Sequence, residues 1–122
     1  MIGYVTLGSN NLERAAAFYD ALLGELGARR VMEFPGFILW GTGPTTPSIA
    51  VCNPFNQEPA TVGNGVMIAI PVNSREDVDR LHARALALGG TDEGAPGERG
   101  PTFYAGYFRD LDGNKLNFFK IG

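Results

Sequence analysis

The first part of the chain alternates short runs of strand-like pattern with one run of helical pattern. In residues 2–8, β-branched, aromatic and aliphatic side chains alternate between two faces, which predicts a strand. Apolar residues then recur at spacings of three and four, as in an amphipathic helix, after a capping box formed by Asn10 and Glu13. Gly24 or Gly27 can end this helix, because glycine readily adopts the left-handed conformation found at helix C-termini.

Three further β-prone runs complete the first part. They lie at residues 30–34, 37–40 and 48–52, and they are separated by Pro35-Gly36 and by the glycine- and proline-rich residues 41–47. The predicted order is therefore strand, helix, strand, strand, strand, or βαβββ.

The second part of the chain repeats this order. Without a gap, Tyr4, Asn10 and Glu13 align with Met67, Asn73 and Glu76. The expected elements are a strand at 66–72, a helix at 73–88, a short strand within 91–96, and strands at 102–110 and 115–121. We therefore predict an α+β protein made of two βαβββ modules.

The pattern also predicts how the modules are joined. We expect a single domain over residues 1–122, with module one at about 1–55, a linker at 56–64 and module two at about 65–122. Pro59 and Gly63 mark the linker, and its short length indicates that the two modules pack together.

Composition limits the classes of function. The chain has 122 residues, is 44% hydrophobic and carries a formal net charge of -3 with a pI near 5.0, which argues against a basic patch of the kind that nucleic-acid binding needs. A single cysteine excludes an internal disulfide, and no apolar run approaches the ~18 residues of a membrane helix. Since no export segment is evident, we expect a cytoplasmic protein that binds neither nucleic acid nor membranes.

Residues 102–121 are the most informative stretch. Both arms are rich in aromatic and branched residues, and Asp112-Gly113-Asn114 supplies a turn between them, because Gly113 can take a positive φ at no steric cost. We expect Asp110 and Asp112 to support this turn through hydrogen bonds to the backbone rather than to take part in chemistry. The stretch therefore predicts a hairpin.

This hairpin resembles the end of proteins of the vicinal-oxygen-chelate superfamily, the glyoxalase, bleomycin-resistance and extradiol-dioxygenase relatives. Residues 104–107 and 110–114 follow the family's pattern, with Leu111 in the place of a proline. Phe18-Tyr19 in the first helix, and Gly-Ala-Pro-Gly at 94–97 followed by Arg99, are also similar. The resemblance implies a glyoxalase-like fold, in which two modules form a cupped mixed β-sheet around a small cavity, with the helices outside. It also implies a homodimer, since a cupped sheet leaves an apolar concave surface.

The same resemblance bears on metal binding. Members of the family draw metal ligands from the first and last strands of each module, and here Tyr4, Met67 and Asn117 hold three of those places, while residues 48–52 offer no carboxylate or imidazole. A neutral phenol, a thioether and an amide are poor ligands for Zn, Ni, Fe or Mn ions, because none supplies anionic charge or a strong donor nitrogen. We therefore predict no metal and no other cofactor.

Candidate ligand contacts follow from these positions. Tyr4, Met67 and Asn117 either line the cavity or are packed strand residues. Arg99 either clamps a carboxylate or phosphate or is a solvated loop charge. Trp40, with Phe37, is either a cavity wall or part of the core.

Two further side chains, His82 and Cys52, could in principle act as a catalytic base or a nucleophile. His82, the single histidine, lies at the edge of a helical stripe, where a structural role is more common than that of a catalytic base. Cys52 has no base or cation near it in sequence to lower its pKa, so we expect it to be a small buried hydrophobe rather than a nucleophile.

Two functions remain open at this point. The first is a metal-free homodimer that binds a small organic molecule in the cupped sheet. The alternative is a lyase, isomerase or dioxygenase-like enzyme, either dependent on a divalent metal held by ligands not recognised in the sequence or metal-free with Tyr4 as an acid or base.

Overall fold

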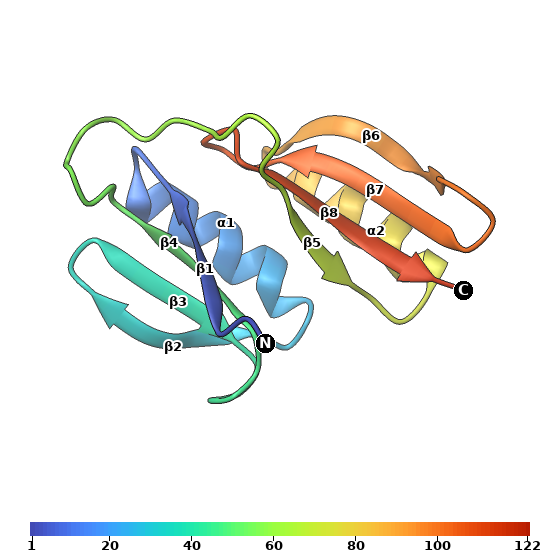
Figure 1. Ribbon diagram of the computed structural model, residues 1–122, viewed down its shortest axis with the longest axis horizontal. Helices are drawn as coiled ribbons and strands as arrows, with labels where there is room; N and C mark the ends of the chain where they lie inside the picture. Colours follow the sequence, from blue (N-terminus) through green and yellow to red (C-terminus); the bar gives the residue numbers. More distant parts are fainter. The chain divides into compact units, whose positions relative to one another are not determined.

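The computed structural model describes residues 1–122, and its helices and strands fall into two compact units. Unit one spans Met1–Val62 and unit two spans Gly63–Gly122. Both units have the predicted α+β composition and the predicted βαβββ order (Figure 1). The expectation that the two modules form one domain stays a prediction.

Unit one is a four-stranded mixed sheet with one helix. Its elements are β1 (Tyr4–Gly8), α1 (Leu12–Gly24), β2 (Arg29–Phe34), β3 (Phe37–Gly41) and β4 (Ser48–Cys52). The strands lie in the order β1-β4-β3-β2, with β1 parallel to β4 and the other neighbours antiparallel. The helix α1 contacts β2, β3 and β4.

Unit two repeats this arrangement. Its elements are β5 (Ile68–Pro71), α2 (Arg75–Ala87), β6 (Thr91–Glu98), β7 (Phe103–Arg109) and β8 (Lys115–Ile121). The strand order is β5-β8-β7-β6, again with the first and last strands parallel. Neither helix of the chain is long and apolar enough to cross a membrane.

Both helices begin one residue later than the sequence predicts. The N-cap of α1 is Asn11, whose Oδ1 accepts from the backbone N–H of Arg14 at 3.1 Å, and the N-cap of α2 is Ser74, whose Oγ accepts from Asp77 at 3.0 Å. The predicted capping boxes at Asn10 and Asn73 are therefore wrong. Because both caps shift by the same single residue, the two units still align.

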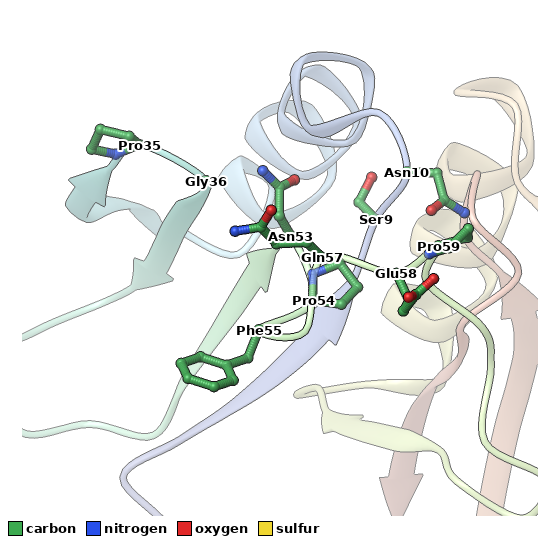
Figure 2. Close-up of a pocket in the computed structure, with 10 residues that line it drawn as sticks. All are labelled: Ser9, Asn10, Pro35, Gly36, Asn53, Pro54, Phe55, Gln57, Glu58 and Pro59. Atoms are coloured by element: carbon green, nitrogen blue, oxygen red, sulfur yellow. The ribbon is translucent and has the colours of Figure 1, made fainter.

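Asn10 instead anchors the segment that follows β4. Its side-chain Oδ1 accepts from the backbone N–H of Ala60 at 2.7 Å, and its Nδ2 donates to the carbonyl of Ala60 at 3.1 Å. The carboxamide thus pairs with both backbone groups of one residue, as a neighbouring strand would. Figure 2 shows Asn10 beside this segment.

β6 is longer than the short strand predicted within residues 91–96, because it runs through the glycine-rich residues 94–97 to Glu98. Its pairing with β7 shifts register between Asp92 and Gly94 and again between Gly94 and Gly97. These bulges, together with the position of β6 at the edge of the sheet, let the strand include Pro96. Arg99 therefore follows a bulged edge strand directly.

The core of each unit lies between its helix and its sheet. In unit one, Leu7 of β1 is buried as predicted, together with Tyr19, Leu22, Trp40 and Val51. In unit two, the buried residues include Val78, Leu81, Phe108, Leu116 and Phe118, and the rings of Phe108 and Phe118 stack with their centroids 5.4 Å apart.

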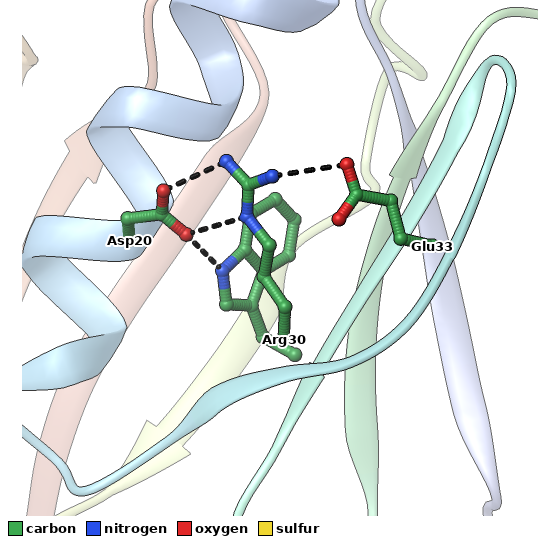
Figure 3. A network of polar contacts seen from close by, with 4 residues as sticks. Asp20, Arg30 and Glu33 are labelled. Carbon is green, nitrogen blue, oxygen red and sulfur yellow. Dashed lines mark hydrogen bonds and ion pairs between the residues drawn. The ribbon is translucent and has the colours of Figure 1, made fainter.

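A polar network ties α1 to the sheet of unit one. Asp20 Oδ1 accepts from the indole N–H of Trp40 at 2.8 Å, and both carboxylate oxygens of Asp20 accept from the guanidinium of Arg30, which also pairs with Glu33 (Figure 3). Trp40 is 1% exposed, so its indole N–H has no access to water as an alternative acceptor. The hydrogen bond from Arg30, together with that from Trp40, lowers the pKa of Asp20 despite an opposing effect of burial.

Two substitutions of Asp20 should separate the indole bond from the ion pair. Asp20→Ala should lower the free energy of unfolding by about 1–3 kcal/mol, because it leaves the buried N–H of Trp40 without an acceptor. Asp20→Asn keeps an oxygen acceptor and loses only a partly exposed ion pair, so it should cost no more than about 1 kcal/mol. Urea unfolding followed by the fluorescence of Trp40, the single tryptophan, measures both. Equal losses in the two variants would contradict the role of the indole bond.

The difference in the free energy of unfolding between wild type and Asp20→Asn should also depend on pH. Because the pKa of Asp20 is lower in the folded protein than in the unfolded chain, its charge stabilises the fold above its ordinary pKa. This contribution is lost as pH falls through the lowered pKa of Asp20, so the stabilities of the two proteins should converge in acid, below the ordinary pKa of an aspartate.

Candidate functional site

The alternation of strand residues divides the sheet of unit two into two faces. Tyr104 and Gly106 face α2, since the Tyr104 hydroxyl donates to Asp79 at 2.7 Å and a Cβ on Gly106 would lie 3.1 Å from the His82 ring. Ala105, which lies between them, points away from α2, as do the alternate residues Phe103 and Tyr107. The partners of these residues in β8 point the same way. We call this side the distal face of unit two. It carries Phe103, Ala105, Tyr107, Arg109, Lys115, Asn117, Phe119 and Ile121.

Asn117 lies in the middle of the distal face. In β8 it pairs with Tyr107 of β7 on one side and with Ala69 of β5 on the other. Its side chain is 1% exposed, and its Oδ1 makes no hydrogen bond. A buried carboxamide oxygen without a donor costs stability, which makes Asn117 a candidate position for contact with a ligand.

Two cations flank Tyr107 on the same face. The guanidinium of Arg99 lies 5.5 Å from the centroid of the Tyr107 ring, and the Lys115 ammonium lies 5.4 Å from it. Arg99, predicted as a ligand contact, is therefore in the same region as Asn117. Tyr107 and Lys115 belong to the same region. No sequence motif marks them as ligand contacts, because only the strand register shows which residues adjoin Asn117.

Met67 lies one residue before β5. Ala69, two residues later, pairs with Asn117, so the alternation of the chain brings Met67 to the distal side of unit two as well. Met67 is 37% exposed. Of the predicted contacts, Met67, Asn117 and Arg99 thus gather on one face of unit two, whereas Tyr4 and Trp40 belong to unit one.

Tyr4 occupies the equivalent position in unit one. It pairs with Ser48 of β4, is 56% exposed, and meets the ring of Phe37 edge-on at 6.3 Å. Phe37 in turn contacts the ring of Phe34 at 6.0 Å. Phe37, weighed as a cavity wall or core, is therefore part of a partly exposed aromatic row on the sheet of unit one.

Trp40 is not part of that row. Its indole donates to Asp20 on α1, and its ring contacts Tyr19 of the same helix at 5.7 Å. The side chain therefore packs in the core of unit one and does not present a surface to a ligand.

His82 and Cys52 have structural surroundings. His82 Nε2 lies 3.1 Å from both Asp92 Oδ1 and the carbonyl of Tyr107, and its ring fills the space left by Gly106. Burial raises the pKa of the Cys52 thiol, and a hydrogen bond with Thr6 offsets this only in part. The thiol therefore stays protonated near neutral pH, a state that disfavours a nucleophilic role.

Asp110 supports the turn of the final hairpin, as predicted. Its Oδ1 accepts from the backbone N–H groups of Asp112 and Asn114, each at 2.9 Å, and its Oδ2 accepts from the side chain of Asn114 at 3.0 Å. Gly113 has the positive φ that the turn requires, at 90°. The Asp110 side chain is thus committed to the geometry of this turn, whereas Asp112 contributes its backbone N–H, and the expected role of the Asp112 side chain stays a prediction.

Unit one carries three open hollows that the sequence does not reveal, one of about 340 Å³ beside α1 and two larger ones. The first of the larger hollows, of about 550 Å³, lies between the β2–β3 turn and the segment after β4, with Asn10, Gly36 and Phe55 among its lining residues (Figure 2). The other, of about 640 Å³, is lined by Arg29, Met32 and Leu39 among others. Both are formed by residues distant in sequence, so no local motif marks them.

The donors present do not make a metal site of the expected kind. No group of three or more histidine, cysteine, aspartate or glutamate side chains is placed to hold a metal ion. At the family's ligand positions on unit two stand Met67 and Asn117, with the cations Arg99 and Lys115 close by. A positively charged neighbourhood repels a divalent cation, so the residues present do not fit the group.

Comparisons with known proteins place this geometry among related chains. Residues 1–118 match the Glyoxalase/Bleomycin resistance protein/Dioxygenase superfamily. A glyoxalase/bleomycin resistance protein from Albidiferax ferrireducens is 38% identical and has a TM-score of 0.88, with 98% of this chain and 97% of that chain covered. No curated protein sequence gives a match.

More distant structures share the fold. A glyoxalase/bleomycin resistance protein/dioxygenase family enzyme from Burkholderia phytofirmans is 21% identical with a TM-score of 0.81, covering 98% of each chain. A lactoylglutathione lyase from Agrobacterium tumefaciens is 23% identical with a TM-score of 0.71, covering 98% of this chain and 92% of that one. At these identities the likeness concerns the fold alone.

Replacement of Asn117 should stabilise the protein. Asn117→Leu keeps a similar volume and removes a buried oxygen that has no hydrogen-bond donor, so the free energy of unfolding should rise by about 1–2 kcal/mol. Thermal and urea unfolding of the purified protein measure the change.

Asn114→Leu is the matched control. Asn114 is also a buried asparagine in the final hairpin, but, unlike Asn117, its side chain has a partner, because it donates to Asp110. This variant should lose about 1–3 kcal/mol by leaving Asp110 with fewer donors. A loss of stability in both variants would show that Asn117 is an ordinary structural residue.

Proposed function

The chain belongs to the Glyoxalase/Bleomycin resistance protein/Dioxygenase superfamily, and from this premise we propose that it binds a small organic molecule on the distal face of unit two without the help of a metal ion. The observation that carries the proposal is Asn117, a buried carboxamide whose Oδ1 has no donor, at the place where the family has a metal-binding glutamate. A ligand hydroxyl or amide N–H would satisfy this oxygen.

The surroundings of Asn117 support an aromatic or otherwise flat ligand. The rings of Phe103 and Phe119 stack with centroids 5.4 Å apart and an angle of 20° between their planes, and Tyr107 lies across from Asn117. Flat apolar groups gain from stacking on such rings, and one or two hydrogen bonds then orient them.

Access to Asn117 depends on its neighbours. Lys115 is two residues away on the same strand face, and Met67 precedes the strand that pairs with β8. Both side chains are long and unbranched, so they can change rotamer to admit a ligand without movement of the backbone.

Binding without a metal can be tested with a neutral probe. In a titration of the ¹⁵N-labelled protein with 4-hydroxybenzamide, the backbone amides of Tyr107, Asn117 and Phe119 should shift, and EDTA should leave the dissociation constant unchanged. Elemental analysis of the purified protein should find less than one metal ion per chain. A tightly held stoichiometric metal, or loss of binding after EDTA, would contradict the proposal.

The role of Asn117 is tested by the same titration. Asn117→Leu should weaken binding about ten-fold or more, since the probe's hydroxyl then loses its acceptor in a buried place. Asn64→Leu, at an exposed asparagine of the segment between β4 and β5, serves as the control and should bind as wild type does. Equal binding by all three proteins would place the ligand elsewhere.

A further inference from the structure

The distal face of unit two has an excess of positive charge beside Asn117. Arg99 and Lys115 both approach the ring of Tyr107, at 5.5 Å and 5.4 Å from its centroid, and neither forms an ion pair with a carboxylate. The two charges therefore lie within about a Debye length of each other, ~10 Å at 0.1 M salt, and repel one another. An arrangement of this kind is favoured when an anion sits between or beside the cations.

Arg99 is held in place by neutral groups. Its Nη2 donates to the carbonyl of Ala95 at 2.6 Å and its Nη1 to the carbonyl of Glu98 at 3.4 Å. Glycine at positions 94 and 97 leaves room for it, because a Cβ on Gly97 would lie 2.9 Å from Nη1 and one on Gly94 would lie 3.4 Å from Nη2. The guanidinium is therefore positioned on β6 before any ligand binds, and its charge is not neutralised.

The other charged residues near this face do not change its net positive charge. Arg109 pairs with Glu93 at 3.0 Å, so these two neutralise each other. Glu98 turns to the α2 side, where it pairs with Arg75 at 2.8 Å. The net charge around Asn117 is thus set by Arg99 and Lys115, although the whole chain carries -3.

We propose that the ligand of this site is a small organic anion, a flat carboxylate that also carries a hydroxyl or amide donor. Its carboxylate binds Arg99 and Lys115, its flat body stacks on Tyr107, and its donor satisfies Asn117 Oδ1. This inference rests on the proposed function, which it narrows from small organic molecules in general to anionic ones.

Matched acids and amides test the charge requirement. The probes are 2-, 3- and 4-hydroxybenzoate and the three corresponding hydroxybenzamides, which have the same ring and hydroxyl and differ in charge. The acid that binds most tightly should have a dissociation constant at least about ten-fold lower than that of its amide at low salt. This difference should shrink as the salt concentration rises. Isothermal calorimetry or the amide-shift titration gives the dissociation constants.

Charge variants locate the effect. Arg99→Gln and Lys115→Gln should each weaken the acids about ten-fold and leave the amides nearly unchanged. Lys120→Gln is the control for Lys115, because Lys120 lies on the same strand but pairs in register with Tyr104 on the α2 side. It should change neither series.

Gly97→Ala tests the positioning of Arg99 without any change of charge. The new Cβ would push the end of the flexible Arg99 side chain, which can yield without disturbing the backbone. Acids should therefore bind more weakly to this variant while amides bind as before. Unfolding curves of the variant confirm that the fold is intact.

The outcomes separate the two proposals. If acids and amides bind equally well and Asn117→Leu weakens both, the anionic ligand is wrong and the small-molecule site stands. If neither series binds, or if binding does not respond to Asn117→Leu, the proposed function itself is wrong and the anionic ligand falls with it. If the acids bind better but Lys120→Gln weakens them as much as Lys115→Gln does, the effect is one of general charge and the assignment to this face is overturned.

Discussion

The parallel pairing of the first and last strand in each unit is the constraint on which the rest of the structure depends. A hairpin cannot join two parallel neighbours, so the chain must leave β1 or β5, cross over through a helix and return through two antiparallel strands. This route puts the helix on one face of each sheet and leaves the other face without a covering helix of its own unit. The residues of the candidate site, Asn117 among them, stand on that second face of unit two.

The repeat gives the two sheets the same architecture but different chemistry. Ala50 on β4 pairs with Thr6 as Asn117 on β8 pairs with Ala69, so the corresponding place holds a methyl group in unit one and a carboxamide in unit two. Tyr4 stands beside aromatic rings, whereas Met67 belongs to a face with two unpaired cations. Both faces carry aromatic rings, but divergence of the two units leaves a buried carboxamide and two cations on the face of unit two alone.

Asn117 shows how a stability cost can point to function. A fold that needed only to be stable would place an apolar side chain among Phe119, Ala69 and Tyr107, whereas this chain buries an oxygen without a donor. The same reasoning applies to Arg99 and Lys115, whose mutual repulsion brings no benefit to the isolated chain. A ligand with a hydrogen-bond donor and a negative charge removes both costs at once.

The sequence alone determined what depends on neighbouring residues: the βαβββ order, the final hairpin and the role of Asp110 in its turn all follow from local periodicity and turn chemistry. It misplaced both helix caps by one residue, and at α1 the reason is that Asn10 has a distant partner in Ala60 that local pattern cannot reveal. Only the tertiary structure decided that Trp40 faces α1, that Asn117 lacks a donor, and that Arg99 and Lys115 meet at Tyr107. The physical reason is that strand register and bulges bring together residues far apart in the chain, and these contacts, rather than residue type, decide which polar groups are satisfied.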